Sequence, residues 1–146
     1  MIDNAEGTLR LTLNGAENSR TLAGHFVTKT FGSSIQHLAF ETDDIFAAAD
    51  AMQLDVLQVS DTYYSDIEAR FGLDPELLGA LQARNIFYDR DDLGGEFFQF
   101  YSQSFGEGFF FEIVERRGKY SGYGAPNAPF RIAAQKQAIA RTLSRT

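Results

Sequence analysis

Three polar residues in aromatic surroundings, His37, Gln99 and Glu112, have the residue types and spacing that suggest chemistry. Glu112 stands in the middle of GFFFEIVE, between Phe110 and Val114 on one face of a predicted strand. A carboxylate buried there carries a desolvation cost of several kcal/mol unless a cation or hydrogen-bond donors compensate it. The pattern leaves two interpretations open, a buried ion pair and a metal ligand.

His37 and Gln99 occupy similar positions on two other predicted strands. His37 lies in SIQHLAF, where both strand faces are largely apolar, so we expect its side chain to be buried. A lone buried histidine is more often a structural residue than a ligand, and its position alone does not decide between the two. Gln99 lies in EFFQFYS and shares a face with Phe97 and Tyr101. Its amide either bonds within the core or orients a polar ligand atom.

One imidazole and one carboxylate form two thirds of the facial triad that holds non-haem Fe(II). Because the chain has no cysteine, nitrogen and oxygen atoms must supply all ligands of any metal. The only other histidine is His25, which lies in a glycine-flanked segment before the SIQHLAF strand. The scarcity of histidines and the lack of a G-x-S-x-G motif exclude a serine hydrolase triad.

These residues need a sheet to bring them together, and the periodicity of the sequence predicts one. Alternating patterns predict strands, and helical spacing after capping residues predicts helices. The expected order is strand 34–40, helix 45–52, strand 55–59, helices 61–71 and 75–85, and strands 86–88, 96–102 and 108–115. This order indicates an α+β domain whose last three strands follow one another directly.

The two ends of the chain have weaker patterns. The segment TLRLTL, 8–13, predicts an isolated strand, and 20–33 predicts a short irregular helix. The glycine-rich segment GKYSGYGAPNAP leads to a last helix at about 128–145. For that helix we expect one buried apolar face and one solvated basic face. The expected buried residues are Ile132, Ala133 and Ile139, and the expected exposed ones are Arg131, Lys136, Arg141 and Arg145.

Composition excludes several classes of protein. The chain has 146 residues, of which 44% are hydrophobic and 14% aromatic, which is enough for one domain with a real core. Its net charge of −7 argues against nucleic acid as a partner. The sequence has no signal peptide and no apolar run of about 18 residues, so we expect a cytoplasmic protein with no membrane partner.

The blocks SIQHLAFETDDIF, YYSDIEARFGLDPELLGALQARNIFYDRD, EFFQFYSQSF and FFFEIVERRGKYSGYGAPN resemble the catalytic part of 4-hydroxyphenylpyruvate dioxygenase-like proteins, members of the vicinal oxygen chelate superfamily. The resemblance implies a glyoxalase/bleomycin-resistance-like βαβββ module at 34–115 that forms a half-barrel sheet. It implies a remnant of a preceding module and a linker at 1–33, and a connector with a C-terminal helix at 116–146. The stretches GEFFQFY and GYGAPN are also similar to bifunctional proteins with a 3-dehydroshikimate dehydratase barrel before a dioxygenase-like part.

The resemblance also implies a reaction and a site. His37 and Glu112 match ligands of Fe(II), which another divalent metal could replace. The family couples decarboxylation of an aromatic 2-oxo acid to hydroxylation of its ring by dioxygen. The other implied site residues are Gln36 and Gln99, which help to orient the substrate, and Tyr101, Phe110 and Tyr123, which surround its ring.

Two departures from the family leave alternatives open. The first histidine ligand of the family lies on a strand that falls before residue 1, so a missing upstream module or a second copy of the chain has to complete the site. In a homodimer, two His37 and two Glu112 would meet at one metal. Where the family has Gly-Asn-Phe, this chain has Pro126-Asn127-Ala128, which changes the expected pocket. The alternative is a non-catalytic structural, oligomerisation or metal-binding C-terminal domain of a 3-dehydroshikimate dehydratase fusion.

Overall fold

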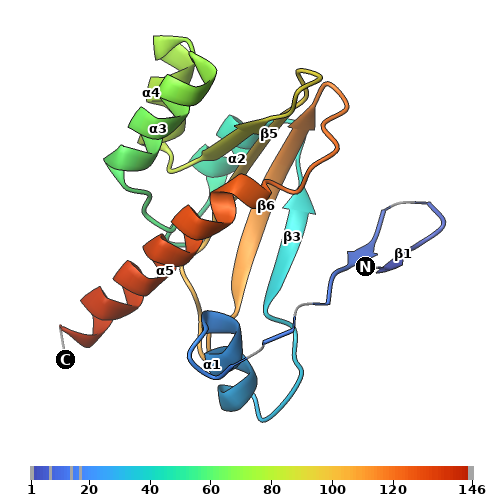
Figure 1. Ribbon diagram of the computed structural model, residues 1–146, viewed down its shortest axis with the longest axis vertical. Coiled ribbons are helices and arrows are strands. Elements are labelled where there is room, and N and C mark those ends of the chain that lie inside the picture. The colour runs from blue at the N-terminus through green and yellow to red at the C-terminus, as the bar shows by residue number, and fades with distance from the viewer. Residues whose placement is uncertain (1, 7, 14, 17, 145–146) are drawn as a thin grey trace. The chain divides into compact units, whose positions relative to one another are not determined.

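A computed structural model of the chain describes residues 2–6, 8–13, 15–16 and 18–144 (Figure 1). Arg145 therefore lies outside the described residues. The chain divides into two compact units, Met1–Ile35 and Gln36–Thr146, and each is described by itself. Within the described residues, no helix is long and apolar enough to cross a bilayer.

The first unit contains a small two-stranded ladder and one helix. Strand β1 (Ile2–Asp3) pairs antiparallel with β2 (Arg10–Leu11). The strand expected over 8–13 is reduced to Arg10 and Leu11. Among the described residues β1 is the only strand that pairs with it, and its leucines are exposed. Helix α1 (Leu22–Lys29) begins where the Thr21 side chain accepts a hydrogen bond from the Gly24 N–H at 3.0 Å.

The second unit contains a mixed four-stranded sheet in the order β3-β6-β5-β4. Its strands are β3 (His37–Glu41), β4 (Phe87–Arg90), β5 (Glu96–Tyr101) and β6 (Phe110–Arg117). Strands β3 and β6 are parallel, and the other neighbours are antiparallel. The predicted α+β class, with a strand, helices and three consecutive strands followed by a C-terminal helix, is confirmed.

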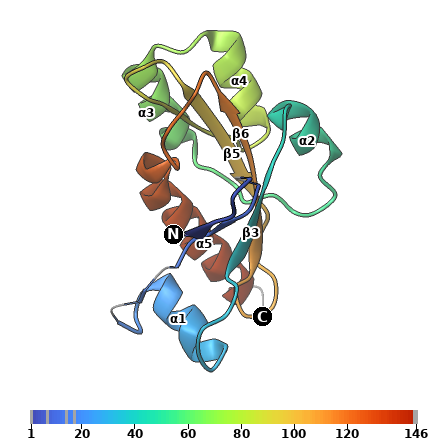
Figure 2. The ribbon, with the colours of Figure 1, turned by 90° about the vertical axis from the view of Figure 1, so that its right-hand side faces the viewer.

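Helices cover both faces of this sheet (Figures 1 and 2). Helix α2 (Ile45–Ala51) lies on one face, and α5 (Ala128–Leu143) crosses the other after a short 3-10 turn, η1 (Ala125–Asn127). Helices α3 (Asp61–Phe71) and α4 (Pro75–Ala83) complete the connection to β4. The side chains of Asp44 and Asp74, the residues before α2 and α4, accept hydrogen bonds from the first turns of these helices.

The strand expected over 55–59 is not formed. Only Val56 makes a bridge to Ser102, beside two further backbone hydrogen bonds, from Leu57 N–H to the Tyr101 carbonyl at 2.8 Å and from Gln103 N–H to the Asp55 carbonyl at 2.7 Å. Strand β4 occupies the same edge of β5 from Glu96 to Gln99, so the segment finds free backbone groups only beyond the end of β5.

A network of buried hydrogen bonds fixes the start of α5. The Tyr63 hydroxyl of α3 lies 2.9 Å from Asn127 Oδ1 and 3.0 Å from the Tyr88 carbonyl oxygen, and it accepts from the Tyr88 N–H at 2.7 Å. The Asn127 amide donates to the same carbonyl at 3.3 Å. These bonds join helix α3, strand β4 and the beginning of α5. They fix the rotation of α5 about its axis, and so decide which of its side chains face the sheet.

The face of α5 that is buried differs from the one expected from the sequence. Ile132, Ala133 and Ile139 are exposed, whereas Arg131 is half-buried against the sheet. The residues that α5 turns inward share a spacing of four, and they are Phe130, Ala134 and Ala138, with Gln135 beside them. The prediction that Arg131 is exposed is therefore wrong, because the Asn127 network fixes the rotation of the helix and overrides the larger isoleucines.

Candidate functional site

His37 and Glu112 lie on the same face of the sheet, on its two parallel strands. The register pairs His37 with Phe110 and Ala39 with Glu112, so both side chains point to the face that α5 crosses. His37 Nε2 lies 3.5 Å from Glu112 Oε2. Residues 75 positions apart in the chain thus form a close pair, as expected if both belong to one site.

Glu112 is the more buried member of the pair. Its side chain is 12% exposed, and that of His37 is 33% exposed. His37 is therefore less enclosed than the sequence predicts, because β3 is the edge strand of the sheet. Glu112 Oε1 accepts a hydrogen bond from the Tyr101 hydroxyl at 3.0 Å, across the β5–β6 pair. One carboxylate oxygen is held by Tyr101, and the other faces His37.

Burial disfavours the charged form of both groups. It raises the pKa of the Glu112 carboxyl above its ordinary value, and the hydrogen bond from Tyr101 and the positive charge of Arg131 only partly offset this. Burial also lowers the pKa of His37, and the charge of Arg131 adds to the effect. The close contact therefore joins the carboxyl to a neutral imidazole rather than forming a strong ion pair. A neutral imidazole is the form that ligates metals.

Aromatic rings fix the geometry of the pair. The Phe110 ring stacks on the His37 imidazole, with centroids 5.1 Å apart and planes within 4° of parallel. The Tyr101 ring meets Phe110 edge to face at 5.9 Å. Tyr101 and Phe110, both predicted as site residues, thus lie around His37 and Glu112. Their own roles toward a substrate stay predictions.

Gln99 precedes Tyr101 by two residues on β5, so its side chain lies on the same face of the sheet. The residue is 1% exposed, and its Oε1 is the buried side-chain atom for which the described residues offer no hydrogen-bond partner. Oε1 lies against Gly124, where an added Cβ would stand 2.6 Å from it. A buried acceptor without a donor is rare in folded proteins, and it commonly marks a place where a ligand or water completes the bonding. This agrees with the predicted orienting role of Gln99 without testing it.

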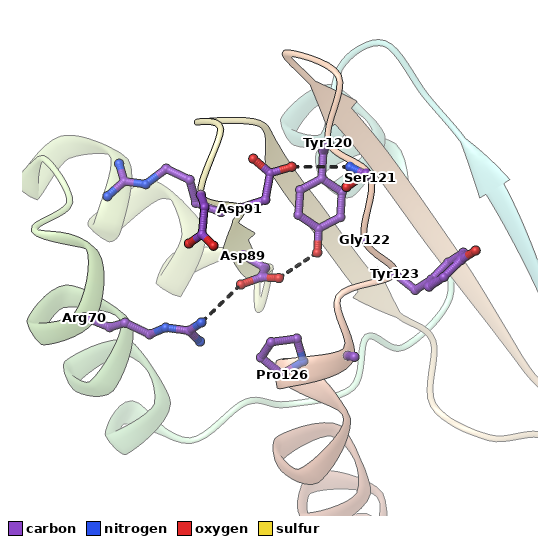
Figure 3. A pocket seen from close by; sticks show the side chains of 11 residues that line it. Arg70, Asp89, Asp91, Tyr120, Ser121, Gly122, Tyr123 and Pro126 are labelled. Atoms are coloured by element: carbon purple, nitrogen blue, oxygen red, sulfur yellow. Dashed lines mark hydrogen bonds and ion pairs between the residues drawn. The ribbon is translucent and has the colours of Figure 1, made fainter.

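Gln36 directly precedes His37, and Tyr123 lies on the connector after β6. Gln36 is half-buried just before β3, and its backbone carbonyl accepts from the Phe110 N–H at 3.1 Å. Tyr123 lies exposed on the connector at the rim of a separate cavity of about 350 Å³, where its side chain points away from Asp89 (Figure 3). In that cavity Asp89 accepts from the Tyr120 hydroxyl at 2.6 Å and lies 3.9 Å from Arg70 Nη2. The predicted roles of Gln36 and Tyr123 stay predictions.

The pair fits two of the positions around a metal ion. Ligand bonds of about 2.0–2.2 Å allow one ion to be shared by a nitrogen and an oxygen at this separation. Within the part of the chain that the structure describes, no three His, Cys, Asp or Glu side chains come together as a metal site. His25 belongs to the first unit, on α1. A complete triad therefore needs a further ligand beyond His37 and Glu112.

Arg131 is the site residue that sequence reasoning missed. Its guanidinium carbon lies 5.7 Å from the centre of the Tyr101 ring and 5.6 Å from that of Phe110. It reaches this position because α5 turns Phe130, Ala134 and Ala138 toward the core. The spacing of these three residues is a signal that could have found it, but the isoleucines of the same helix favour a different face.

The sequence of this chain is similar to parts of several longer proteins. No protein-family model matches the sequence. The chain is 45% identical over 135 residues to a 3-dehydroshikimate dehydratase of Pseudomonas putida, a match that covers 90% of this chain and 21% of that protein. It is 30% identical over 126 residues to a 4-hydroxyphenylpyruvate dioxygenase of Legionella pneumophila, covering 83% of this chain and 36% of that protein. The chain thus spans about a fifth of the length of the first relative.

The fold of this chain is also similar to parts of larger proteins of known structure. A xylose isomerase-like TIM barrel/4-hydroxyphenylpyruvate dioxygenase fusion protein matches with a TM-score of 0.79 and 42% identity, over 93% of this chain and 22% of the other. A mutant of 4-hydroxymandelate synthase from Streptomyces coelicolor matches with a TM-score of 0.65 and 25% identity, over 79% of this chain and 33% of the other.

Proposed function

The chain is homologous to the C-terminal, 4-hydroxyphenylpyruvate dioxygenase-like region of 3-dehydroshikimate dehydratase fusion proteins, within the vicinal oxygen chelate family, and on that premise we propose that it provides half of a non-haem Fe(II) dioxygenase-type site. The observation that carries the proposal is the 3.5 Å approach of His37 Nε2 to Glu112 Oε2 on a shared, aromatic-lined sheet face. His37 and Glu112 would hold the metal. The bound metal would supply open positions for a 2-oxo acid and dioxygen.

The remaining residues of the face have supporting roles in this proposal. Tyr101 holds one oxygen of Glu112 and leaves the other free to ligate. Phe110 fixes the plane of the His37 ring by stacking. Gln99 offers a buried acceptor that would orient a polar substrate group. The proposed substrate is an aromatic 2-oxo acid, and the proposed reaction couples its decarboxylation to ring hydroxylation.

A partner has to complete the site. Strand β3 is the edge of the sheet, and no strand among the described residues pairs with its outer side. Two of its apolar side chains are strongly exposed, Leu38 at 42% and Phe40 at 52%. Free edges and exposed apolar side chains are features that proteins normally cover. We propose that an upstream module or a second copy of the chain lies along β3 and supplies the missing ligand.

The second candidate function is non-catalytic. The matched region is about a fifth of the 3-dehydroshikimate dehydratase relative, and the described residues hold no complete triad. Both facts favour a structural, oligomerisation or metal-binding domain of a fusion protein. Such a domain would keep the His37–Glu112 pair without dioxygen chemistry.

Oxygen uptake separates the two functions. The chain is supplied anaerobically with Fe(II), then mixed with dioxygen and 4-hydroxyphenylpyruvate. The dioxygenase proposal expects uptake that depends on the 2-oxo acid, is lost in Glu112→Gln and is kept in the control Glu68→Gln, which alters an exposed glutamate on α3. Iron-loaded protein that consumes no dioxygen with this acid or with phenylpyruvate would favour the non-catalytic function.

A further inference from the structure

A cavity of about 350 Å³ lies where the end of α3, the end of β4 and the connector after β6 meet (Figure 3). Arg70 comes from α3, Asp89 from β4 and Tyr120 from the connector. His37 and Glu112, the residues of the proposed metal site, are not among those that line it. The cavity has room for a small molecule, since ligand pockets in proteins begin at about 300 Å³.

Asp89 places a nearly buried carboxylate in this cavity. Its side chain is 7% exposed, and its Oδ2 accepts a hydrogen bond from the Tyr120 hydroxyl at 2.6 Å. The same hydroxyl accepts from the Gly124 N–H at 3.1 Å, and the Tyr120 ring stacks on Phe97 with the ring centroids 5.0 Å apart. Tyr120 therefore fixes the orientation of the Asp89 carboxylate before a ligand binds.

The second oxygen of Asp89 faces Arg70 without bonding to it. Asp89 Oδ1 lies 3.9 Å from Arg70 Nη2, which is beyond hydrogen-bonding distance (Figure 3). Among the described residues, no hydrogen bond reaches either of these two atoms. Nearly buried polar atoms normally have a hydrogen-bond partner. The pair therefore presents an unused acceptor and an unused donor side by side in the cavity.

We propose that this cavity binds a free α-amino acid, whose ammonium group donates to Asp89 Oδ1 and whose carboxylate accepts from Arg70. The ammonium nitrogen and the carboxylate oxygens of an α-amino acid are about 3 Å apart, because only the α-carbon separates the two groups. This spacing suits a protein acceptor and donor that are 3.9 Å apart. Each charge of the ligand meets the opposite charge, and a simple amine or a simple acid can use only one of the two.

The walls of the cavity indicate the side chain of the amino acid. The ring of Tyr120 and the side chains of Ala125 and Pro126 supply the apolar part of the lining. Asp91 is already bonded, because its Oδ2 accepts from the Ser121 N–H at 3.3 Å and its Oδ1 accepts from N–H groups of the β4–β5 turn. We therefore expect an uncharged, apolar side chain such as that of leucine.

A weak surface ion pair is the competing explanation for Arg70 and Asp89. Such pairs contribute little to stability, and they select no ligand. The inference does not rest on the proposed function, because the cavity needs neither a metal nor His37 and Glu112. All binding measurements are therefore made with a chelator present, so that their outcome is independent of the metal site.

The test is a titration of the isotope-labelled chain with L-leucine, followed by the chemical shifts of the backbone amides. Two ligands serve as controls: 3-methylbutylamine lacks the carboxylate, and 4-methylpentanoate lacks the ammonium group. We expect L-leucine to bind and to shift the amides of Ser121 and Gly122, which line the cavity. Each control ligand should bind at least about tenfold more weakly.

Variants of the two charged residues test the assignment of each contact. Arg70→Gln should fold, since the Arg70 side chain is 54% exposed, and Asp89→Asn keeps an acceptor for Tyr120. We expect each variant to weaken L-leucine binding by about tenfold or more. Asp92→Asn removes a charge from an exposed position at the same cavity, and it should change the dissociation constant by less than about twofold.

A further variant covers the case in which Asp89→Asn fails to fold. Arg70→Lys keeps the charge but lacks the planar fork of a guanidinium, so we expect L-leucine binding weakened about three- to tenfold. Equal L-leucine affinity in the wild type and the Arg70 variants would overturn the proposal. Equal affinity for L-leucine and either control ligand would also overturn it, as would unshifted amides at the cavity when L-leucine is added to the wild type.

Discussion

Glu112 is the residue of this site whose burial is energetically most unfavourable. It is nearly enclosed between aromatic strands, and burial raises the pKa of its carboxyl in spite of the hydrogen bond from Tyr101 and the charge of Arg131. A residue chosen for stability at this position would be apolar or fully paired. Such locally unfavourable residues are typical of functional sites, where stability is lower than it could be.

Replacing Glu112 with glutamine should therefore stabilise the metal-free chain at neutral pH. A raised pKa means that the folded chain keeps the carboxyl proton at pH values where the unfolded chain, near the ordinary value of 4.5, has lost it. Wild-type stability from this group is complete below that value and falls as the pH rises through the raised pKa. Glutamine does not titrate, so Glu112→Gln should gain about 0.5–2 kcal/mol at neutral pH, and the gain should shrink as the pH falls to about 4.

Urea unfolding with a chelator, from about pH 4 to pH 8, measures this difference. Glu68→Gln, at an exposed position, should differ from the wild type by less than about 0.5 kcal/mol throughout. Lower stability of Glu112→Gln at neutral pH would show that the carboxylate stabilises the fold through its hydrogen bonds.

At this scale the sequence identifies polar residues within aromatic strands, but it does not predict how these residues meet. The positions of His37, Gln99 and Glu112 within aromatic strands mark them as polar groups in need of partners. These side chains share a face because β3 pairs with β6 and β6 pairs with β5. The alternation of residues within a single strand does not predict which strands pair, or in which register. Arg131 was missed because its placement depends on the rotation of α5.

At the scale of elements, the start of α5 decides which side chains reach the site. Asn127 joins the helix to Tyr63 and Tyr88 through buried hydrogen bonds, and Phe130 packs on the Tyr63 ring at 5.0 Å. The starts of α2 and α4 were predictable because capping signals are local, as with Asp44 and Asp74. The absence of a strand at 55–59 and the rotation of α5 about its axis could not be predicted from local signals. The first depends on β4 occupying the edge of β5, and the second depends on the buried hydrogen bonds of Asn127.

Replacing Asn127 with alanine should loosen this anchoring. The Tyr63 hydroxyl and the Tyr88 carbonyl would each lose a buried partner, so we expect a loss of about 1–3 kcal/mol in the free energy of unfolding. Hydrogen exchange of α5 should accelerate more than that of β5. The control Gln137→Ala, at an exposed position of the same helix, should change the free energy of unfolding by less than about 0.5 kcal/mol. An unchanged exchange rate in α5 for Asn127→Ala would contradict this account of how the helix is positioned.

At the scale of the whole molecule, β3 is the feature that points to a partner. Among the described residues no strand pairs with the outer edge of β3, and this strand carries the exposed Leu38 and Phe40. A partner placed along this strand would cover apolar surface and lie next to His37 and Glu112 at the same time. The relatives that this chain matches are several times longer, which agrees with a domain that works within a larger assembly.

A charged residue on this strand should weaken assembly and leave the fold intact. Leu38→Lys places an ammonium group on the exposed apolar surface, so we expect the dissociation constant of a homodimer to rise by about tenfold or more. Sedimentation over a concentration series measures it. Leu93→Lys, in the exposed turn between β4 and β5, is the matched control. Equal dissociation constants for the two variants would place the contact elsewhere.

The central claim, for the case in which the partner is a second copy of the chain, is that His37 and Glu112 are two ligands of a metal site completed across the contact between the copies. It is tested most directly by anaerobic Fe(II) binding with the mass in solution determined on the same sample. The account predicts about one Fe(II) per two chains in a dimer, lost in Glu112→Gln. A dimer that binds no Fe(II), a monomer that binds one Fe(II) per chain, or a Glu112→Gln variant with unchanged Fe(II) affinity would contradict it.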